Sequence, residues 1–211
     1  PVRHAMRRQC AQRDERPLVT HRREPADQPA PRRRRGPHHL VHIEIARRLG
    51  AGLFISLHAD AVAKADKAHG ATIYTLSEVA SGREAALLAR EQNQSDFIGG
   101  VDLRRQEREV TSILIDLTQR ESMAASAQFA NLLHREGRPF FPFRPIWHQF
   151  AAFAVLKAPD MPSILFESGY LTNAEDSAYI QSDEGQRQIA SGMRRAIEAH
   201  FARRMMRRGR R

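Results

Sequence analysis

Short apolar runs and segments of helical periodicity alternate through the middle of the chain. Three apolar runs, at 53–57, 71–76 and 163–166, have the length and the β-branched or aromatic content of strands, and a fourth short strand is expected near 153–156. Helical segments separate these runs. The alternation predicts an α/β fold: an open, mostly parallel sheet flanked by helices.

Local signals mark where the helices begin and end. Gly50 and Gly52 follow a helix end, and the stretch from Ser81 to Glu84 has the spacing of a capping box. Residues 137–145 are rich in aromatic residues and proline and are expected to form a loop. The expected helices are 43–49, 84 to about 97, 111 to about 134, and one that begins near position 182.

The two ends of the chain differ from this middle part. Residues 1–42 contain 11 Arg, six Pro and five His but no Lys, Phe or Ile, and residues 203–211 contain six Arg. These ends carry net charges of +7 and +6 out of the total of +10, so residues 43–202 carry −3. We expect both ends to be solvated basic tails, the first of them disordered. The composition of 1–42 is also typical of a GC-rich message read in the wrong frame, which is the interpretation that we favour.

Charge and hydropathy limit the classes of function. A basic tail attracts nucleic acid or anionic lipid through nonspecific charge, but no groove-reading motif accompanies it, so no specific nucleic-acid partner is expected. No apolar run reaches about 18 residues, and we expect no transmembrane segment. No signal peptide is visible, and the single cysteine, Cys10, excludes an internal disulfide.

Two of the predicted strands end on residues that bind metals or transfer protons. His58 follows the first run, with Asp60 two residues on, and Glu167 follows the last run at a Ser-Gly turn. Active sites of open α/β sheets lie beyond the carboxyl ends of the strands, so we expect one shared site. Apolar neighbours are expected to raise the pKa of Glu167 toward that of a general base. Each residue also has a structural interpretation: His58 as a partly buried histidine, and Glu167 as an acceptor for backbone N–H groups.

Several motifs in one order resemble a known enzyme family. Three strings resemble zinc-dependent N-acetylmuramoyl-L-alanine amidases of the cell-separation type. They are Phe54-Ile-Ser-Leu-His-Ala-Asp60, Gly70-Ala-Thr-Ile-Tyr-Thr-Leu-Ser77 and Val155-Leu-Lys-Ala-Pro-Asp-Met-Pro-Ser-Ile-Leu-Phe-Glu-Ser-Gly-Tyr-Leu-Thr-Asn173. Residues 93–102 and 115–121 resemble that family's long insertion. The resemblance extends from about residue 43 to residue 201.

The resemblance implies an activity and a site. It implies zinc-dependent hydrolysis of the amide between N-acetylmuramic acid and L-alanine in peptidoglycan, which serves cell-wall turnover and the separation of daughter cells. In that family two histidines and one glutamate hold the zinc ion, and a further glutamate is the general base. By position, His58 matches the last zinc histidine and Glu167 matches the catalytic glutamate. The substrate also implies a periplasmic enzyme, although no export signal is visible in the sequence.

The family's other two zinc ligands have no match. They lie in a Gly-His-Gly-Gly-like turn and on the first helix, whereas only the basic tail precedes position 43. His38, His39, His42 and Glu44 can bind metals but lie at the wrong place relative to His58. We therefore interpret the N-terminal part as truncated or frame-disrupted. Two alternatives remain: a peptidoglycan amidase, or a non-catalytic amidase domain that binds the cell wall or an activator protein.

The predicted domain, 43–202, contains a helical segment, 83–147, that matches the insertion. In relatives this insertion includes a helix that covers the zinc site until an activator protein displaces it, so the resemblance implies a regulatory role. Glu84 and Glu91 either reach a metal in such an arrangement or lie on a solvated helix face. His148 is a weaker candidate for a residue that faces the substrate.

Overall fold

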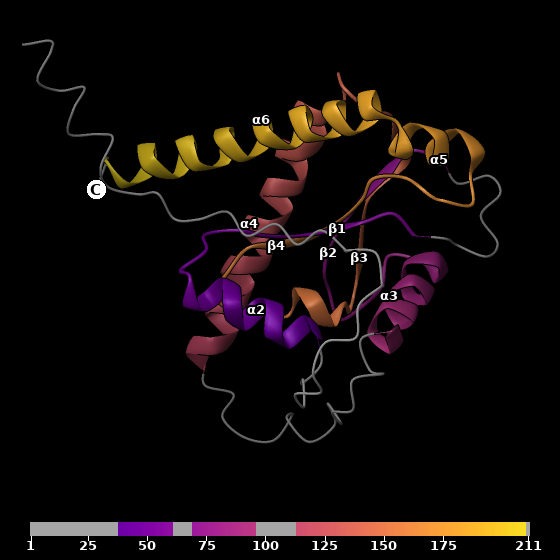
Figure 1. Ribbon diagram of the computed structural model, residues 1–211. Coiled ribbons are helices and arrows are strands. Elements are labelled where there is room, and N and C mark those ends of the chain that lie inside the picture. The colour runs from indigo at the N-terminus through magenta and orange to yellow at the C-terminus, as the bar shows by residue number, and fades with distance from the viewer. Residues whose placement is uncertain (1–37, 61–68, 96–112, 210–211) are drawn as a thin grey trace, which may run out of the picture.

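The computed structural model describes residues 38–60, 69–95 and 113–209 of the chain (Figure 1). These residues form a sheet with helices on both of its faces, which confirms the predicted α/β class. In chain order the elements are α2 (His38–Arg48), β1 (Phe54–His58), β2 (Ala71–Leu76), α3 (Arg83–Ser95), α4 (Ile113–Gly137), β3 (Phe143–Ala151), the 3₁₀ helix η3 (Ala154–Leu156), β4 (Ser163–Glu167), α5 (Ala174–Gln181) and α6 (Asp183–Arg208).

The four strands are arranged in the order β1-β4-β2-β3. The pairs β1–β4 and β2–β3 are parallel, whereas β2 and β4 are antiparallel. Most pairings are therefore parallel, as expected, but the sheet is mixed. The carboxyl ends of β1 and β4 lie at the same end of the sheet, beside the start of β2.

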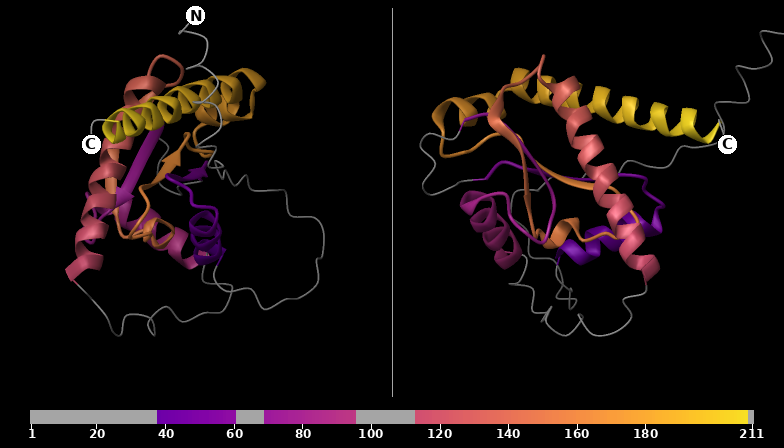
Figure 2. Two further views of the ribbon diagram at one scale, coloured as in Figure 1. Left: turned by 90° about the vertical axis from the view of Figure 1, so that its left-hand side faces the viewer. Right: turned by 180° about the vertical axis from the view of Figure 1, so that it is seen from behind.

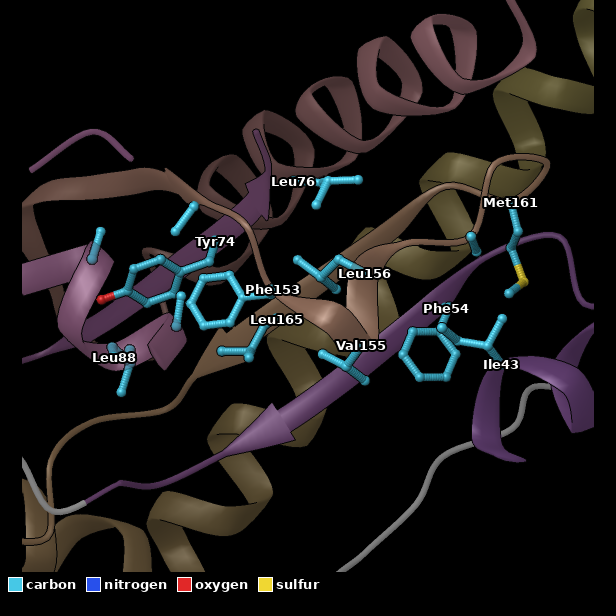
Figure 3. Packing of buried hydrophobic residues seen from close by; sticks show 14 of the residues in the cluster. Ile43, Phe54, Tyr74, Leu76, Leu88, Phe153, Val155, Leu156, Met161 and Leu165 are labelled. Carbon is cyan, nitrogen blue, oxygen red and sulfur yellow. The ribbon is translucent and has the colours of Figure 1, made fainter. Parts of the chain in front are cut away.

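Two hydrophobic clusters lie on opposite faces of the sheet. One contains Phe54, Tyr74 and Leu165 and is covered by α2, α3 and η3 (Figure 3). The other contains Ile73 and Phe166 and is covered by α4 and α6. Successive side chains of a strand point to opposite faces, which assigns neighbouring residues to different clusters. Figure 2 shows α4 and α2 on the two sides of the sheet.

The structure corrects two local predictions. The segment 137–145, predicted to be a loop, contains the start of β3 from Phe143. Pro145 is exposed on β3, which forms one edge of the sheet, where a missing N–H donor is tolerated. The strand predicted near 153–156 is instead the single 3₁₀ turn η3.

Helices also extend into both predicted tails. Residues 38–42 belong to α2, and α6 continues through Arg208. Residues 1–37 lie outside the described part of the chain, so the expected disorder there stays a prediction. The described parts of the segment 83–147, residues 83–95 and 113–147, supply α3, α4 and part of β3, and both clusters include their side chains, so these parts belong to the packed domain. None of the helices described is sufficiently long and apolar to span a bilayer.

Candidate active site

The ends of β1 and β4 bring His58 and Glu167 together. The two residues are direct register partners in a parallel pair, so their side chains point to the same face of the sheet. Asp60 lies two residues beyond the end of β1. One ligand atom from each of the three residues lies within 4.8 Å of the others, and no second group of this kind occurs among the residues described.

Glu167 is a buried carboxyl group with one free oxygen. Its Oε2 accepts the backbone N–H of Asp60 at 3.2 Å. Its Oε1 is buried and has no hydrogen-bond partner among the described residues. Burial, and after it the negative charge of Asp60, raises the pKa of Glu167 well above its ordinary value. Such a group is suited to accept a proton.

His58 is held from both sides of its ring. Nε2 lies 2.8 Å from the hydroxyl of Ser56, and Nδ1 lies 3.8 Å from Oδ1 of Asp60. The backbone carbonyl of His58 accepts both the N–H and the hydroxyl of Ser168 at 3.0 Å. Nδ1 is therefore the ring nitrogen that faces the carboxylate of Asp60.

Asp60 connects the site to helix α3. Its side chain accepts a hydrogen bond from Gln92, and its backbone carbonyl accepts the N–H of Leu171 at 3.0 Å. Burial acts to raise the pKa of Asp60, but the hydrogen bond and charge of His58, with other hydrogen bonds, outweigh it, so the pKa is lowered. Asp60 therefore stays a carboxylate at neutral pH.

The turn after β4 is anchored by a second buried carboxylate, Asp176 of α5. It accepts the backbone N–H groups of Gly70 and Tyr170 at 3.0 and 2.9 Å, and Nδ1 of His69 lies 2.7 Å away. Gly169 has φ +149°, and a Cβ there would lie 2.9 Å from Cγ of Asp176. Only glycine fits this close approach without displacement of the carboxylate.

A polar network extends from the site across β2 to β3. Thr72 is the register partner of Glu167, and its hydroxyl lies 3.2 Å from that of Tyr170. Arg144 donates to the Tyr170 hydroxyl at 3.0 Å and pairs through both terminal nitrogens with Glu84 of α3. Sequence reasoning did not find Arg144, because it lies within the segment predicted to be a loop.

Other residues considered from the sequence lie away from this group. Glu84 pairs with Arg144, and Glu91 is exposed; neither belongs to the group of possible metal ligands. His148 bonds to the hydroxyl of Thr75 at 3.0 Å, on the face of the sheet opposite Glu167. The structure therefore does not bring His148 to the group around Glu167, and contact of His148 with substrate stays a prediction.

The candidates on α2 do not join the site either. Glu44 pairs with Arg48 at 2.9 Å, and neither His42 nor Glu44 belongs to the group around His58. The side chains of His38 and His39 lie outside what the structure describes.

The residues around His58 fit a divalent cation. An imidazole nitrogen and two carboxylates are ligand types that Zn²⁺ accepts. Oε1 of Glu167 is a buried acceptor without a hydrogen-bond partner among the described residues, and a water molecule bound to the cation would satisfy it. Nδ1 of His58 and Oδ1 of Asp60 lie 3.8 Å apart, close to the separation of roughly 3.5 Å between two ligands of a tetrahedral zinc ion.

The chain resembles amidases in sequence. A sequence profile of the family described as N-acetylmuramoyl-L-alanine amidase matches residues 36–199. The amidase AmiC of Escherichia coli O6:H1 is 33% identical over 163 residues, which cover 77% of this chain and 39% of that protein. AmiC of Neisseria meningitidis serogroup B is 34% identical over 169 residues, which cover 78% of this chain and 40% of that protein.

Solved amidase structures share the fold. The catalytic domain of CwlV from Bacillus (Paenibacillus) polymyxa var. colistinus aligns with a TM-score of 0.52 and 20% identity over 78% of this chain and 66% of that one. AmiC2 of Nostoc punctiforme aligns with a TM-score of 0.52 and 21% identity over 77% of this chain and 65% of that one. The chain spans only 39% and 40% of the length of the two AmiC proteins. Because the family profile matches most of its residues, the chain belongs to the N-acetylmuramoyl-L-alanine amidase family.

Proposed function

We propose that this chain carries out zinc-dependent hydrolysis of the amide between N-acetylmuramic acid and L-alanine in peptidoglycan. The observation that carries the proposal is the pairing of His58 with Glu167 at the ends of two adjacent strands, with one buried oxygen of Glu167 that has no hydrogen-bond partner among the residues described. Membership of the amidase family supplies the reaction and the substrate class.

Each residue of the group has a distinct part in the proposal. His58 would bind zinc through Nδ1, and Asp60 is the carboxylate nearest to that nitrogen. A zinc ion held there would supply Lewis-acid chemistry: it would polarise the scissile carbonyl group and lower the pKa of a water molecule. Glu167 would take the proton of the attacking water on Oε1 and deliver it to the departing amine of L-alanine. The hydrogen bond from Asp60 to Oε2 keeps Oε1 available for this transfer.

The raised pKa of Glu167 supports its role as the base. Burial is the main cause, so the carboxyl group binds a proton more tightly than an exposed glutamate does. A base whose pKa lies closer to neutral pH both accepts the proton of water and releases it to an amine.

A second candidate function is a non-catalytic domain that binds the cell wall or an activator protein. The composition of the metal group favours it: among the described residues the group contains one histidine, whereas the family resemblance implies two histidines and a glutamate in addition to the base. Hydrolysis of a muropeptide separates the two candidates.

We also infer the cellular location, the biological role and a regulatory partner of the enzyme. Peptidoglycan lies outside the inner membrane, so a periplasmic location and a role in daughter-cell separation follow from the proposed reaction. An activator protein is the proposed regulatory partner, because α3 contacts the site through the bond from Gln92 to Asp60. Movement of α3 would release that carboxylate.

The test uses a purified muropeptide in which the amide joins N-acetylmuramic acid to L-alanine. The chain is incubated with the muropeptide and zinc, and peptides with a new N-terminal alanine are measured by mass spectrometry. We expect product with wild type and at least about 10²-fold less with Glu167→Gln, while Glu175→Gln, at an exposed position, matches wild type. If wild type with zinc forms no product, the first candidate fails; if it also binds peptidoglycan, the second candidate stands.

A further inference from the structure

Arg144 presents its planar guanidinium group beside the candidate active site. It is only 17% exposed, and it pairs with the carboxylate of Glu84 through two nitrogens. It also donates to the Tyr170 hydroxyl at 3.0 Å and lies over the ring of Tyr170, 5.4 Å from its centroid. A guanidinium fork held in this way matches the two oxygens of a carboxylate.

Tyr74 adds an unused hydroxyl group at the same place. Its side chain is fully buried, and its hydroxyl has no hydrogen-bond partner among the described residues. Burial and then the neighbouring Tyr170, Glu167 and Glu84 raise the pKa of Tyr74, so the hydroxyl keeps its proton. Figure 3 shows this hydroxyl directed toward α3. An unpaired buried hydroxyl costs free energy, which a ligand that accepts its hydrogen bond would recover.

The distance to the reacting group suits a peptide. Thr72 pairs with Glu167, and β3 lies on the other side of β2. Arg144 on β3 is therefore about two strand spacings, roughly 10 Å, from Glu167 on β4. Two to three residues of an extended peptide cover roughly 7–10 Å. A substrate whose amide lies at Glu167 can thus place a nearby carboxylate at Arg144.

We propose that Arg144, Tyr170 and Tyr74 form a binding subsite for a carboxylate of the stem peptide, just beyond the amide that is cleaved, and that Glu84 occupies this subsite from within. The inference rests on the proposed function for the identity of the ligand. Exchange of the Glu84 carboxylate for a substrate carboxylate keeps Arg144 paired, so the exchange avoids the cost of a partly buried, unpaired charge. The subsite selects acidic over amidated stem peptides.

Peptide binding measured by calorimetry tests the subsite without any need for hydrolysis. The full chain is titrated with L-alanyl-D-glutamate and with the same peptide amidated at its carboxyl groups. Glu84→Gln removes the internal carboxylate and is expected to bind the acidic peptide at least tenfold more tightly than wild type, with no gain for the amidated peptide. Addition of Arg144→Gln is expected to abolish this gain. The control Glu175→Gln removes an exposed carboxylate and is expected to bind like wild type.

Tyr74→Phe keeps the test decisive if the Glu84 variant does not fold. The substitution removes only a hydroxyl that has no partner among the described residues, so the melting temperature should not fall. We expect Tyr74→Phe to weaken binding of the acidic peptide about threefold or more, and to leave binding of the amidated peptide unchanged.

Two results would overturn the inference: no gain in Glu84→Gln, or an equal gain for both peptides. Either would mean that the ion pair of Arg144 and Glu84 only attaches α3 to the sheet. If the muropeptide is not hydrolysed but the acidic peptide binds as expected, the proposed function fails and the subsite stands. If the muropeptide is hydrolysed but the chain shows no preference for acidic peptides, the proposed function stands and the subsite fails.

Discussion

Asp60 and Glu167 are joined by a 3.2 Å hydrogen bond from the backbone N–H of Asp60 to Oε2 of Glu167. The bond attaches the segment after β1 to the end of β4, and Oε1 is left without a hydrogen-bond partner in the part of the chain that the structure describes. Because the donor is a backbone group, the paired strands themselves set the orientation of the proposed base. The side chain of Asp60 also accepts a bond from Gln92, which connects α3 to the same point.

Replacement of the proposed base should remove most of the activity. Glu167→Gln keeps the shape of the side chain but cannot accept a proton, so the rate of muropeptide hydrolysis should fall about 10²- to 10⁴-fold. Single-turnover rates with saturating zinc measure this change. A loss smaller than tenfold would mean that another group accepts the proton.

The same substitution should stabilise the metal-free protein at neutral pH. The pKa of Glu167 is raised in the folded state, so its contribution to stability is fully present below the unfolded pKa and is lost as pH rises through the folded pKa. Glutamine avoids that loss. We expect Glu167→Gln to melt at a higher temperature than wild type at pH 8, and the difference to shrink toward pH 4.5. Identical differences at the two pH values would contradict the raised pKa.

His200 on α6 should make the fold sensitive to acid. Burial, followed by Arg204 and Arg203, lowers its pKa to about 4, and its Nε2 is buried without a hydrogen-bond partner in the described part of the chain. Since the folded pKa lies below the unfolded one, the stabilising contribution is present above about pH 6.5 and is lost as pH falls toward 4.

Urea unfolding of wild type and His200→Gln checks this dependence. After allowance for partial exposure of the ring, we expect wild type to lose about 1–2 kcal/mol more than the variant between pH 7 and pH 4.5. Parallel losses in the two proteins would show that His200 does not titrate differently in the folded state.

The anchor at Asp176 should be essential to the turn after β4. Asp176→Ala leaves the N–H groups of Gly70 and Tyr170 without an acceptor, and we expect a loss of about 2–4 kcal/mol in the free energy of unfolding. Gly169→Ala should cost about 1–3 kcal/mol through its positive φ and the close carboxylate. The control Glu175→Ala, one residue away and exposed, should change it by less than about 0.5 kcal/mol. A cost at Asp176 no larger than that of the control would contradict the anchoring role.

The buried strands were predictable because their side chains form continuous apolar runs. All of β2 and β4 is buried, so the runs at 71–76 and 163–166 match their bounds closely. The shared position of His58 and Glu167 followed from the rule that sites lie beyond strand ends, although the rule does not give the direction of β2. Apolar content does not distinguish parallel from antiparallel neighbours, and the antiparallel pair was found only in the structure.

The missed elements have physical causes. Pro145 favoured a loop, but β3 is an edge strand that needs fewer N–H donors. Residues 153–156 are all buried, a pattern shared by a strand and a packed turn. Helix α5 was not predicted, although its cap, Asn173, accepts the N–H groups of Glu175 and Asp176. Asn173, with the acids Glu175 and Asp176 at the second and third positions after it, was a sequence signal for the start of a helix.

Zinc bound per chain, measured by elemental analysis, tests the central claim most directly. The protein is stripped with chelator, supplied with one equivalent of zinc and freed of excess. We predict close to one zinc ion per chain for wild type, almost none for His58→Ala, and the wild-type value for His148→Ala, whose side chain lies on the opposite face of the sheet. Negligible zinc in wild type, or equal zinc in wild type and His58→Ala, would contradict a metal site at the ends of β1 and β4.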